Sequence, residues 1–306
     1  MLHYTDVSFN LTNSFKSIIT LPSQGGHGIV MDAGSSKTEM KTLYWDAASP
    51  LDAPIEIGKS QKVKPGISSF KDDLSKVSDL LPLLEQARLN LDEAGVDWTD
   101  VPLFLGATGG MRLLPTSDRM AIMATIRSFF RDNGFRVDDD DWVRVISGAE
   151  EGAFGWLTVN LSLKTLDDST KENPVGLIDI GGASVQLTYL SKLTLLENNL
   201  DLDIVDYDWN LYSQSFLYFG NTQANKQYAQ KLVISGKSAD PCYAIGGNNT
   251  VGMPGYSDPS KCKEAAKSML PLDVPCFQFD GTECSMLNEY LPNLVQVRRY
   301  YLDTLL

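Results

Sequence analysis

The stretch Gly28-Ile-Val-Met-Asp-Ala-Gly-Ser-Ser36 is a short apolar run that ends in an aspartate and a Gly/Ser turn. Met40 to Trp45 then reads as a returning strand, so the segment predicts a β-hairpin with a glycine- and hydroxyl-bearing tip. The stretch Val175-Gly-Leu-Ile-Asp-Ile-Gly-Gly-Ala-Ser184 repeats this arrangement. Its aspartate, Asp179, lies 147 residues (179 minus 32) after Asp32. We therefore expect two related α/β domains whose tips face one cleft.

The chemistry of the two tips suits a phosphate chain. Glycine allows close approach of the backbone, and consecutive turn amides form an anion cradle. Hydroxyl groups at the tips can donate further hydrogen bonds to phosphate oxygens: Ser35, Ser36, Thr38 and Ser184. Each glycine turn taken alone is more typical of an ordinary hairpin. The repeated strand-end aspartates favour a site, because such a carboxylate is costly unless it is paired or holds a hydrated divalent ion.

A third motif, Gly148-Ala-Glu-Glu-Gly-Ala-Phe-Gly-Trp156, follows an apolar strand and places two adjacent acids beside glycines. In a partly desolvated cleft, each carboxylate disfavours ionisation of the other, which raises a pKa toward a value useful for a general base. The alternative is a solvated acidic pair at a helix start, favoured by the helix dipole.

The rest of the chain alternates the patterns of strands and helices. Strands are predicted over 103–107 and 142–146, and helices over 117–134 and 223–232. Residues 68–95 have helical spacing interrupted at Pro82, 212–218 form a strand or a helix entry, and 246–260 form a loop.

Composition limits the class of protein. The 306 residues, 43% of them hydrophobic, suffice for about two domains. The net charge of −13 argues against nonspecific binding to nucleic acid or to an anionic membrane. The sequence contains no run of the roughly 18 apolar residues that span a bilayer, and we expect no signal segment in the first 25 residues.

The four cysteines are clustered in the distal part of the chain: Cys242, Cys262, Cys276 and Cys284. Two local disulfides explain this clustering better than free thiols, whereas zinc is poorly supported because both histidines lie far upstream and no CxxC pair exists. Three triplets read as glycosylation acceptors, beginning at Asn10, Asn160 and Asn248. These features predict an extracellular or secretory-pathway lumenal protein.

Four motifs in order resemble the first four conserved regions of the apyrases, the nucleoside triphosphate diphosphohydrolases. They are Asp32-Ala-Gly-Ser-Ser-Lys-Thr38, Ala107-Thr-Gly-Gly-Met-Arg-Leu-Leu114, Gly148 to Trp156 and Asp179-Ile-Gly-Gly-Ala-Ser-Val-Gln186. Weaker similarity at 64–70, 212–220 and 241–242 extends the resemblance over residues 28 to 284. It implies the actin/ribonuclease H-like fold of the actin, hexokinase and heat-shock chaperone ATPase superfamily, with the nucleotide between two domains.

The resemblance also implies roles for individual residues. Glu151 is the expected catalytic base, Ser184 and Gln186 position the attacking water, and Asp32 and Asp179 hold the water ligands of Ca²⁺ or Mg²⁺. The expected phosphate-binding residues are Gly34, Ser35, Ser36, Lys37, Thr38, Thr108, Gly109, Gly181, Gly182, Ala183 and Ser184. The expected reaction on nucleoside tri- and diphosphates is direct in-line hydrolysis without a phosphoenzyme.

Three departures from the family pattern stand out. Lys37 replaces a frequent histidine, which keeps a phosphate donor but alters the expected preference between tri- and diphosphates. Gly109 replaces a usual alanine. The family's fifth, tryptophan-bearing region is not recognisable before Leu306, so the second domain lacks its usual C-terminal return, and the chain is either partial or has an incomplete nucleoside pocket.

We divide the chain into an N-terminal phosphate-binding domain, residues 1–147, and a second domain, residues 148–306. Two other functions remain open. One is an exopolyphosphatase-like phosphohydrolase, whose related turn ends in an acidic residue where this chain has Gln186. The other is a nucleotide-binding pseudoenzyme or truncated form.

Overall fold

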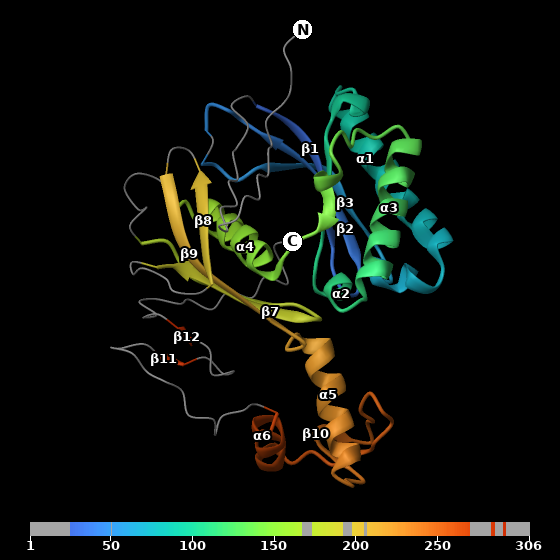
Figure 1. Ribbon diagram of the computed structural model, residues 1–306, viewed down its shortest axis with the longest axis vertical. Coiled ribbons are helices and arrows are strands. Elements are labelled where there is room, and N and C mark those ends of the chain that lie inside the picture. Colours follow the sequence, from blue (N-terminus) through green and yellow to red (C-terminus); the bar gives the residue numbers. More distant parts are fainter. Residues whose placement is uncertain are drawn as a thin grey trace.

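The computed structural model describes residues 25–49, 51–166, 173–191, 198–204, 207–269, 283–284 and 290–291. The described chain forms two main β-sheets, each with helices packed against it, and a small lobe (Figure 1). A separate two-stranded pair joins β11 (Glu283–Cys284) and β12 (Tyr290–Leu291). The fold is α/β, as predicted.

The first sheet has the strand order β3-β2-β1-β4-β5. Its strands are β1 (Gly26–Ala33), β2 (Thr38–Trp45), β3 (Ile55–Val63), β4 (Leu103–Ala107) and β5 (Val143–Val145). β1 pairs antiparallel with β2 and parallel with β4, and β4 pairs parallel with β5. The parallel strands end at one edge of the sheet, which places the β1–β2 tip beside the segment that follows β4.

Helices cover one face of this sheet, on the right in Figure 1. They are α1 (Leu81–Glu93) and α3 (Thr116–Asp132), while the short helix α2 (Gly109–Arg112) lies at the end of the strands, after β4. Short 3-10 helices occur at η1 (Ile67–Asp72), η2 (Leu74–Leu80), η3 (Trp98–Asp100) and η4 (Asp140–Trp142). The helical spacing over 68–95 therefore becomes an α-helix only at Leu81, because Pro82 is tolerated in the first helical turn and not inside a helix.

The second sheet, ordered β6-β7-β9-β8, is antiparallel throughout. Its strands are β6 (Leu177–Ile180), β7 (Ser184–Leu190), β8 (Asn199–Ile204) and β9 (Tyr207–Leu217). Helix α4 (Gly148–Ser162) packs on it through fully buried Trp156, whose ring lies 5.6 Å from that of Trp209. The two halves share three antiparallel strands, β1-β2-β3 in the first sheet and β6-β7-β9 in the second. They differ beyond these strands, since among the described strands the second sheet has no parallel pair.

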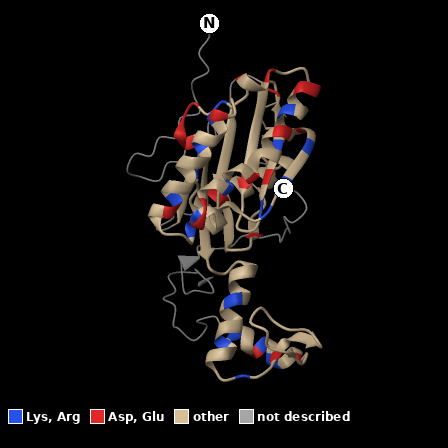
Figure 2. Cartoon of the chain, turned by 90° about the vertical axis from the view of Figure 1, so that its right-hand side faces the viewer, with Lys and Arg blue, Asp and Glu red and all other residues tan. Residues whose placement is uncertain are grey.

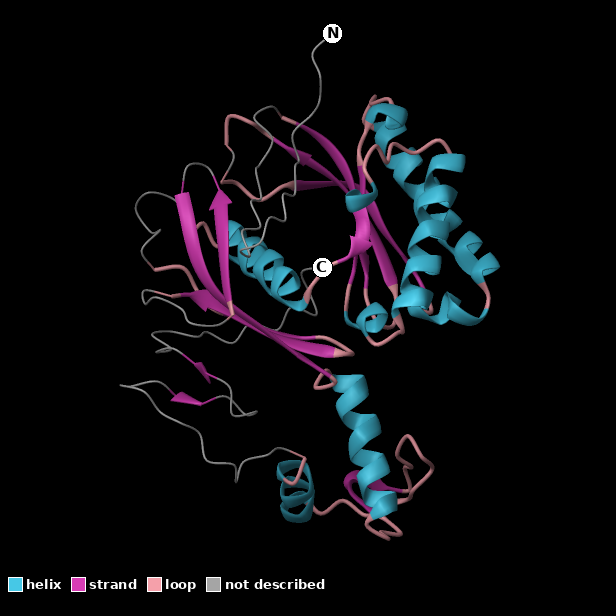
Figure 3. Ribbon diagram, in the orientation of Figure 1, coloured by secondary structure: helices cyan, strands magenta, loops and turns pink. Residues whose placement is uncertain are grey.

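Beyond β9 the chain forms a lobe that projects from the second sheet (Figures 1 and 3). It contains α5 (Asn221–Ile234), β10 (Asp240–Ile245) and α6 (Pro259–Lys267). The buried carboxylate of Asp240 accepts hydrogen bonds from Tyr228 Oη (2.8 Å), the Cys242 amide (2.8 Å) and Asn249 Nδ2 (2.9 Å). These bonds compensate its burial and fix the lobe.

A disulfide joins Cys242 and Cys262, which confirms one local pair. Cys276 and the side chain of Cys284 lie outside the described residues. The expectation for Asn160 is wrong: its side chain is fully buried in α4, and its Nδ2 donates to the carbonyl oxygens of Trp156 and Val175. A glycan has no access there. Asn248 is exposed, and Asn10 lies outside the described residues.

Charged side chains lie mainly on the outer helices and on the lobe (Figure 2). Of the helices that the structure describes, none is long and apolar enough to cross a bilayer.

Candidate active site

The tips of the two hairpins meet. A Cβ atom placed on Gly182 would lie 2.3 Å from Oγ of Ser35, so a side chain at position 182 would force the Ser35 hydroxyl to move. Glycine at position 182 thus allows the close approach of the two tips with the Ser35 hydroxyl in its present position. The predicted phosphate-binding segments, 34–38 and 181–184, are thus brought together although they come from different sheets.

The segment after β4 contacts both tips. The Thr108 amide donates to the carbonyl oxygen of Ala33 (3.1 Å), and a Cβ on Gly110 would lie 2.7 Å from Cα of Ser35. A Cβ on Gly109 would lie 2.8 Å from Cβ of Ala183. An alanine at position 109 would require the second tip to shift in this conformation, so the departure at Gly109 has a packing consequence as well as a conformational one.

The second tip is held from behind by α5. The amides of Asn221 and Thr222 donate to the carbonyl oxygens of Gly181 (2.8 Å) and Gly182 (2.9 Å). The N-terminus of α5 is thereby satisfied by the tip itself. Gly220 precedes the helix, and a Cβ on it would lie 2.4 Å from the Ser184 nitrogen.

Glu151 lies near the start of α4 beside the second tip. Its Oε2 accepts hydrogen bonds from Arg112 Nη2 (2.6 Å) and from Gln186 Nε2 (3.0 Å). The same two nitrogens donate to Oγ of Ser184, at 3.0 Å and 2.8 Å. Glu151, which is partly buried, thus forms one cluster with the buried Ser184 and Gln186. Arg112, from the first half of the chain, closes it.

Glu150 has a different environment from its neighbour. Its side chain accepts from the Ser147 amide (2.8 Å) while Ser147 Oγ accepts from the Glu150 amide (3.1 Å), which completes a capping box at the start of α4. Arg144 Nη2 also donates to Glu150 (2.7 Å). Burial opposes ionisation here, but the bonds from Arg144 and Ser147 keep the pKa of Glu150 below its usual value. The capping interpretation therefore fits Glu150.

Burial raises the pKa of Glu151 to about 7, against the opposing charge of Arg112. The charges of Asp179 and Asp32 add to this rise. Repulsion from the adjacent Glu150, the cause expected from the sequence, is not among the causes. Capping bonds turn Glu150 toward Ser147 and Arg144, so the physical origin of the raised pKa is desolvation.

Asp32 lies at the end of β1, and Asp179 lies near the end of β6, as the sequence predicts. Burial raises the pKa of Asp32 to about 6, with Lys37 opposing and Glu39 and Asp179 adding to the rise. The described residues contain no group of three or more His, Cys, Asp or Glu side chains that could hold a metal directly. The buried carboxylate of Asp32, whose ionised form is destabilised, fits a cation that is held through its water ligands.

Two buried polar atoms at the site have no hydrogen-bond partner among the described residues, Thr38 Oγ1 and Gln186 Oε1. Buried polar atoms are nearly always bonded to protein or to water, so these two atoms favour the binding of water or a polar ligand at the site. Lys37 donates instead to Glu39 Oε2 (2.9 Å). Ser36 is exposed.

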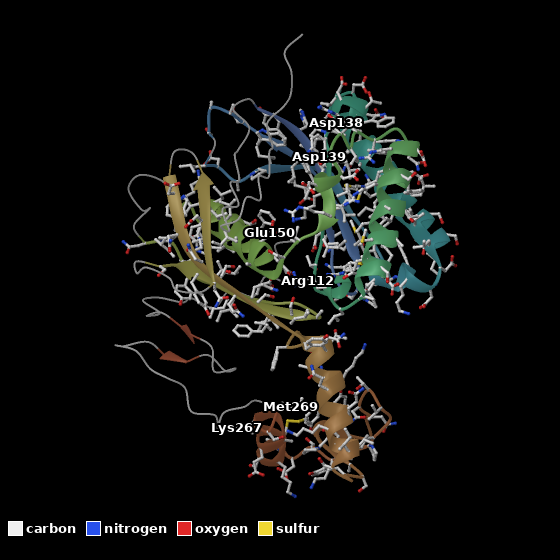
Figure 4. All side chains as sticks on the ribbon, viewed as in Figure 1. Arg112, Asp138, Asp139, Glu150, Lys267 and Met269 are labelled. Atoms are coloured by element: carbon white, nitrogen blue, oxygen red, sulfur yellow. A yellow bond between two sulfur atoms is a disulfide. The ribbon has the colours of Figure 1, made fainter. Side chains whose placement is uncertain are left out.

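Sequence reasoning assigned no role to Arg112 or to Ser215, whose Oγ accepts from Gln186 Nε2 (3.0 Å). Figure 4 shows Arg112 near the junction of the two sheets, with Glu150 on α4. Arg112 is the only charged residue of the motif 107–114, and this feature could have indicated a role for it from the sequence. Nothing local in the sequence distinguishes Ser215, which β9 brings opposite Gln186.

Comparison with known proteins gives consistent matches. The model of the GDA1/CD39 (nucleoside phosphatase) family matches residues 19–300. The nucleoside-triphosphatase ntp-1 of Caenorhabditis elegans is 33% identical over 271 residues, covering 80% of this chain and 48% of that protein. Ectonucleoside triphosphate diphosphohydrolase 1 of Mus musculus is 30% identical over 284 residues, 86% of this chain and 54% of that protein.

Among solved structures, a nucleoside triphosphate hydrolase from Neospora caninum matches with a TM-score of 0.47 and 17% identity, covering 68% of this chain and 47% of that one. The chain spans about half the length of the curated relatives that it matches.

Proposed function

Because the chain belongs to the GDA1/CD39 nucleoside phosphatase family, we propose that it hydrolyses the terminal phosphates of nucleoside tri- and diphosphates by direct attack of water. The observation that carries the proposal is the cluster of Glu151, Ser184 and Gln186 beside the two facing tips. A nucleotide phosphate chain is the ligand class that the tips suit, because both are glycine-rich turns.

Glu151 acts as the general base in this proposal. A carboxylate with a pKa of about 7 is ionised in part at neutral pH and has enough basicity to take a proton from water. Ser184 and Gln186 orient that water, and the unpartnered Gln186 Oε1 provides a free acceptor for it. Arg112 positions Glu151 and Ser184 relative to each other through one nitrogen, Nη2.

The phosphates are held by backbone amides and hydroxyls of the two tips and of the segment after β4. The proposed binding residues are Gly34, Ser35, Ser36, Lys37, Thr38, Thr108, Gly109, Gly181, Gly182, Ala183 and Ser184. Asp32 and Asp179 would hold a Ca²⁺ or Mg²⁺ ion through its water ligands. When bound, that ion neutralises charge on the transferring phosphoryl group.

We also propose an extracellular or secretory-lumen location. The disulfide between Cys242 and Cys262 supports it, because such bonds persist in oxidising compartments. The similarity to proteins named as ectonucleotidases points the same way.

The test is phosphate release by the purified protein from ATP, ADP, UDP and inorganic polyphosphate, with Ca²⁺, with Mg²⁺ and with a chelator. We expect release from the nucleotides that requires a divalent ion. Turnover of polyphosphate alone would indicate an exopolyphosphatase instead. Nucleotide binding without phosphate release would indicate a pseudoenzyme. Full activity in the presence of chelator would contradict the proposed metal dependence.

A further inference from the structure

Four polar residues form a small patch on the face of the second sheet that contacts α4. Gln186 on β7 lies directly opposite Ser215 on β9, and Thr188 lies directly opposite Ser213. Side chains that are directly opposite in antiparallel strands, or two residues apart in one strand, project from the same face of a sheet. Gln186, Thr188 and Ser213 have at most 1% of their surface exposed. We call these four residues the polar patch.

Helix α4 approaches the polar patch through two glycines that are four residues apart. A Cβ on Gly148 would lie 2.2 Å from Cβ of Ser215, and a Cβ on Gly152 would lie 2.4 Å from Oγ1 of Thr188. Residues four apart lie on the same face of a helix. The first turns of α4, which carry Glu151, therefore pack directly on the polar patch, and its hydroxyl groups lie close to the helix backbone.

One hydroxyl of the polar patch bonds to that backbone. Ser213 Oγ donates to the carbonyl oxygen of Ala149 at 2.8 Å and lies 2.9 Å from Thr188 Oγ1. A hydroxyl has one hydrogen and a carbonyl only accepts, so Ser213 donates to Ala149 and Thr188 donates to Ser213. Ala149 is two residues before Glu151. The bond from Ser213 thus holds the turn that carries the proposed base.

The second serine of the polar patch bonds to the amide of Gln186. Nε2 of Gln186 has two hydrogens and contacts three oxygens: Ser184 Oγ at 2.8 Å, Glu151 Oε2 at 3.0 Å and Ser215 Oγ at 3.0 Å. Of these three partners, only Ser215 lies on β9. Ser215 therefore ties the water-orienting amide to the same strand that Ser213 uses to hold the base.

We propose that Ser213 and Ser215 are positioning residues, which together set the separation between Glu151 and the amide of Gln186 from a single strand, β9. Ser215 acts through Gln186, and Ser213 acts through the first turn of α4. Displacement of a catalytic group by about 1 Å can lower a rate by about 10²-fold, so small shifts of either partner have kinetic consequences. This inference rests on the proposed function.

The experiment compares Ser213→Ala and Ser215→Ala with Ser162→Ala as a matched control. Ser162 ends α4, is exposed, and donates to the carbonyl oxygen of Thr158 at 2.8 Å, so its substitution removes a bond of the same kind away from the site. We expect Ser213→Ala and Ser215→Ala each to lower kcat for ATP by about threefold to tenfold, as for the loss of one hydrogen bond. KM should stay within about twofold, and Ser162→Ala should change neither constant by more than that.

Paired substitutions identify the residue through which each serine acts. In a Gln186→Ala background, Ser215→Ala should cause no further fall in kcat, and in a Glu151→Gln background the same should hold for Ser213→Ala. Additive losses would mean that the serines act independently of these residues and would overturn the proposal. Unchanged kcat in the folded single variants would also overturn it.

Thr188 offers a second pair of variants in case Ser213→Ala does not fold. Thr188→Val keeps the shape of the side chain and removes the donor to Ser213, whereas Thr188→Ser keeps that donor. We expect kcat to be lower in Thr188→Val than in Thr188→Ser. Equal kcat values would overturn the role of Ser213.

A measurement without substrate tests the contact of Ser215 apart from turnover. The side-chain amide protons of Gln186, followed by NMR in the free protein, should exchange with water at least about threefold faster in Ser215→Ala than in the wild type or in Ser162→Ala. Unchanged exchange would overturn the inference. Failure of the proposed function is a different result, because the wild type would then release no phosphate while the exchange rates still differed.

Discussion

Glu151 and Glu150 are adjacent in sequence but have separate partners. Substituting each in turn distinguishes the proposed general base, Glu151, from the helix-capping residue, Glu150. We expect Glu151→Gln to lower kcat by about 10² to 10⁴, because an amide cannot take the proton of water. Glu150→Gln should reduce kcat far less, since it weakens a capping box and the contact with Arg144. Phosphate release at saturating substrate measures both, and a larger loss in Glu150→Gln would refute the assignment.

The raised pKa of Glu151 makes activity depend on pH. Only the ionised carboxylate accepts a proton, so kcat/KM should fall as pH drops below about 7. Removing the charge of Arg112 by Arg112→Met should move this fall to higher pH, because the guanidinium favours the ionised form. Arg144→Met, which alters the partner of Glu150, is the control and should leave the midpoint in place.

The same pKa predicts an effect on stability. The folded protein retains a proton on Glu151 between pH 4.5 and about 7 that the unfolded chain has released, so stability falls as pH rises through this window. Glu151→Gln removes this penalty. Denaturant unfolding should show a gain of about 1 to 3 kcal/mol at pH 8 and none at pH 4. A variant less stable than wild type at pH 8 would contradict this.

At the residue scale, the sequence predicted the strand-end aspartates and the acid pair because these are local patterns. It could not predict which partners each acid finds. Arg112 is 39 residues from Glu151, and Ser215 is 29 residues from Gln186, so these contacts depend on how the sheets come together.

Among the elements, β3 depends on one buried amide. Asn90 of α1 donates to the Lys59 carbonyl oxygen (2.9 Å) and to Thr42 Oγ1 (3.1 Å), and its Oδ1 accepts from the Lys59 amide (3.0 Å). The chain bends around this side chain at Gly58, where φ is +69° and a Cβ would lie 2.1 Å from Asn90 Oδ1. Asn90 therefore satisfies backbone hydrogen-bonding groups of the edge strand that a neighbouring strand would otherwise pair with.

We expect Asn90→Ala to lower the free energy of unfolding by about 2 to 3 kcal/mol, because it removes two bonds to the Lys59 backbone and leaves the buried Thr42 hydroxyl without this partner. Gln86→Ala removes only a bond to Asn90 and should cost less than about 1 kcal/mol. Chemical denaturation of the two variants tests this. Equal losses would mean that Asn90 acts through packing alone.

The elements with a clear apolar period were predictable, such as β1, β4 and α3. The strand β3 was not predicted, because it is an edge strand with mostly exposed polar residues and a bend that Asn90 stabilises from a distance. Helix α4 was considered only at its start, where the acid pair indicated a helix dipole. Its interior contains Gly152, which packs against β7 and β9, and Gly155, which packs against β6, and glycine lowers intrinsic helix propensity.

For the whole molecule, the lobe is a locally closed unit that the disulfide stabilises. The bridge between Cys242 and Cys262 closes a 20-residue loop, so its loss should cost about 3 kcal/mol of local stability. We expect Cys242→Ala with Cys262→Ala to speed amide hydrogen exchange in α5 and β10 while β1 and β4 stay protected. Uniform loss of protection in all strands would show that the lobe is not a separate unit.

The attachment of α5 to the second tip couples movement of the lobe to movement of the tip. Three consecutive amides, from Asn221 to Gln223, are bonded to the carbonyl oxygens of Gly181 and Gly182. The 14-residue helix extends from there as a rod of about 21 Å, and Ile234 at its far end is 86% exposed. A tilt of the tip by about 5° would displace that end by about 2 Å. A small rotation of the tip is therefore amplified at the far end of α5. A spectroscopic label at that end would report movement of the tip on phosphate binding without contacting the site.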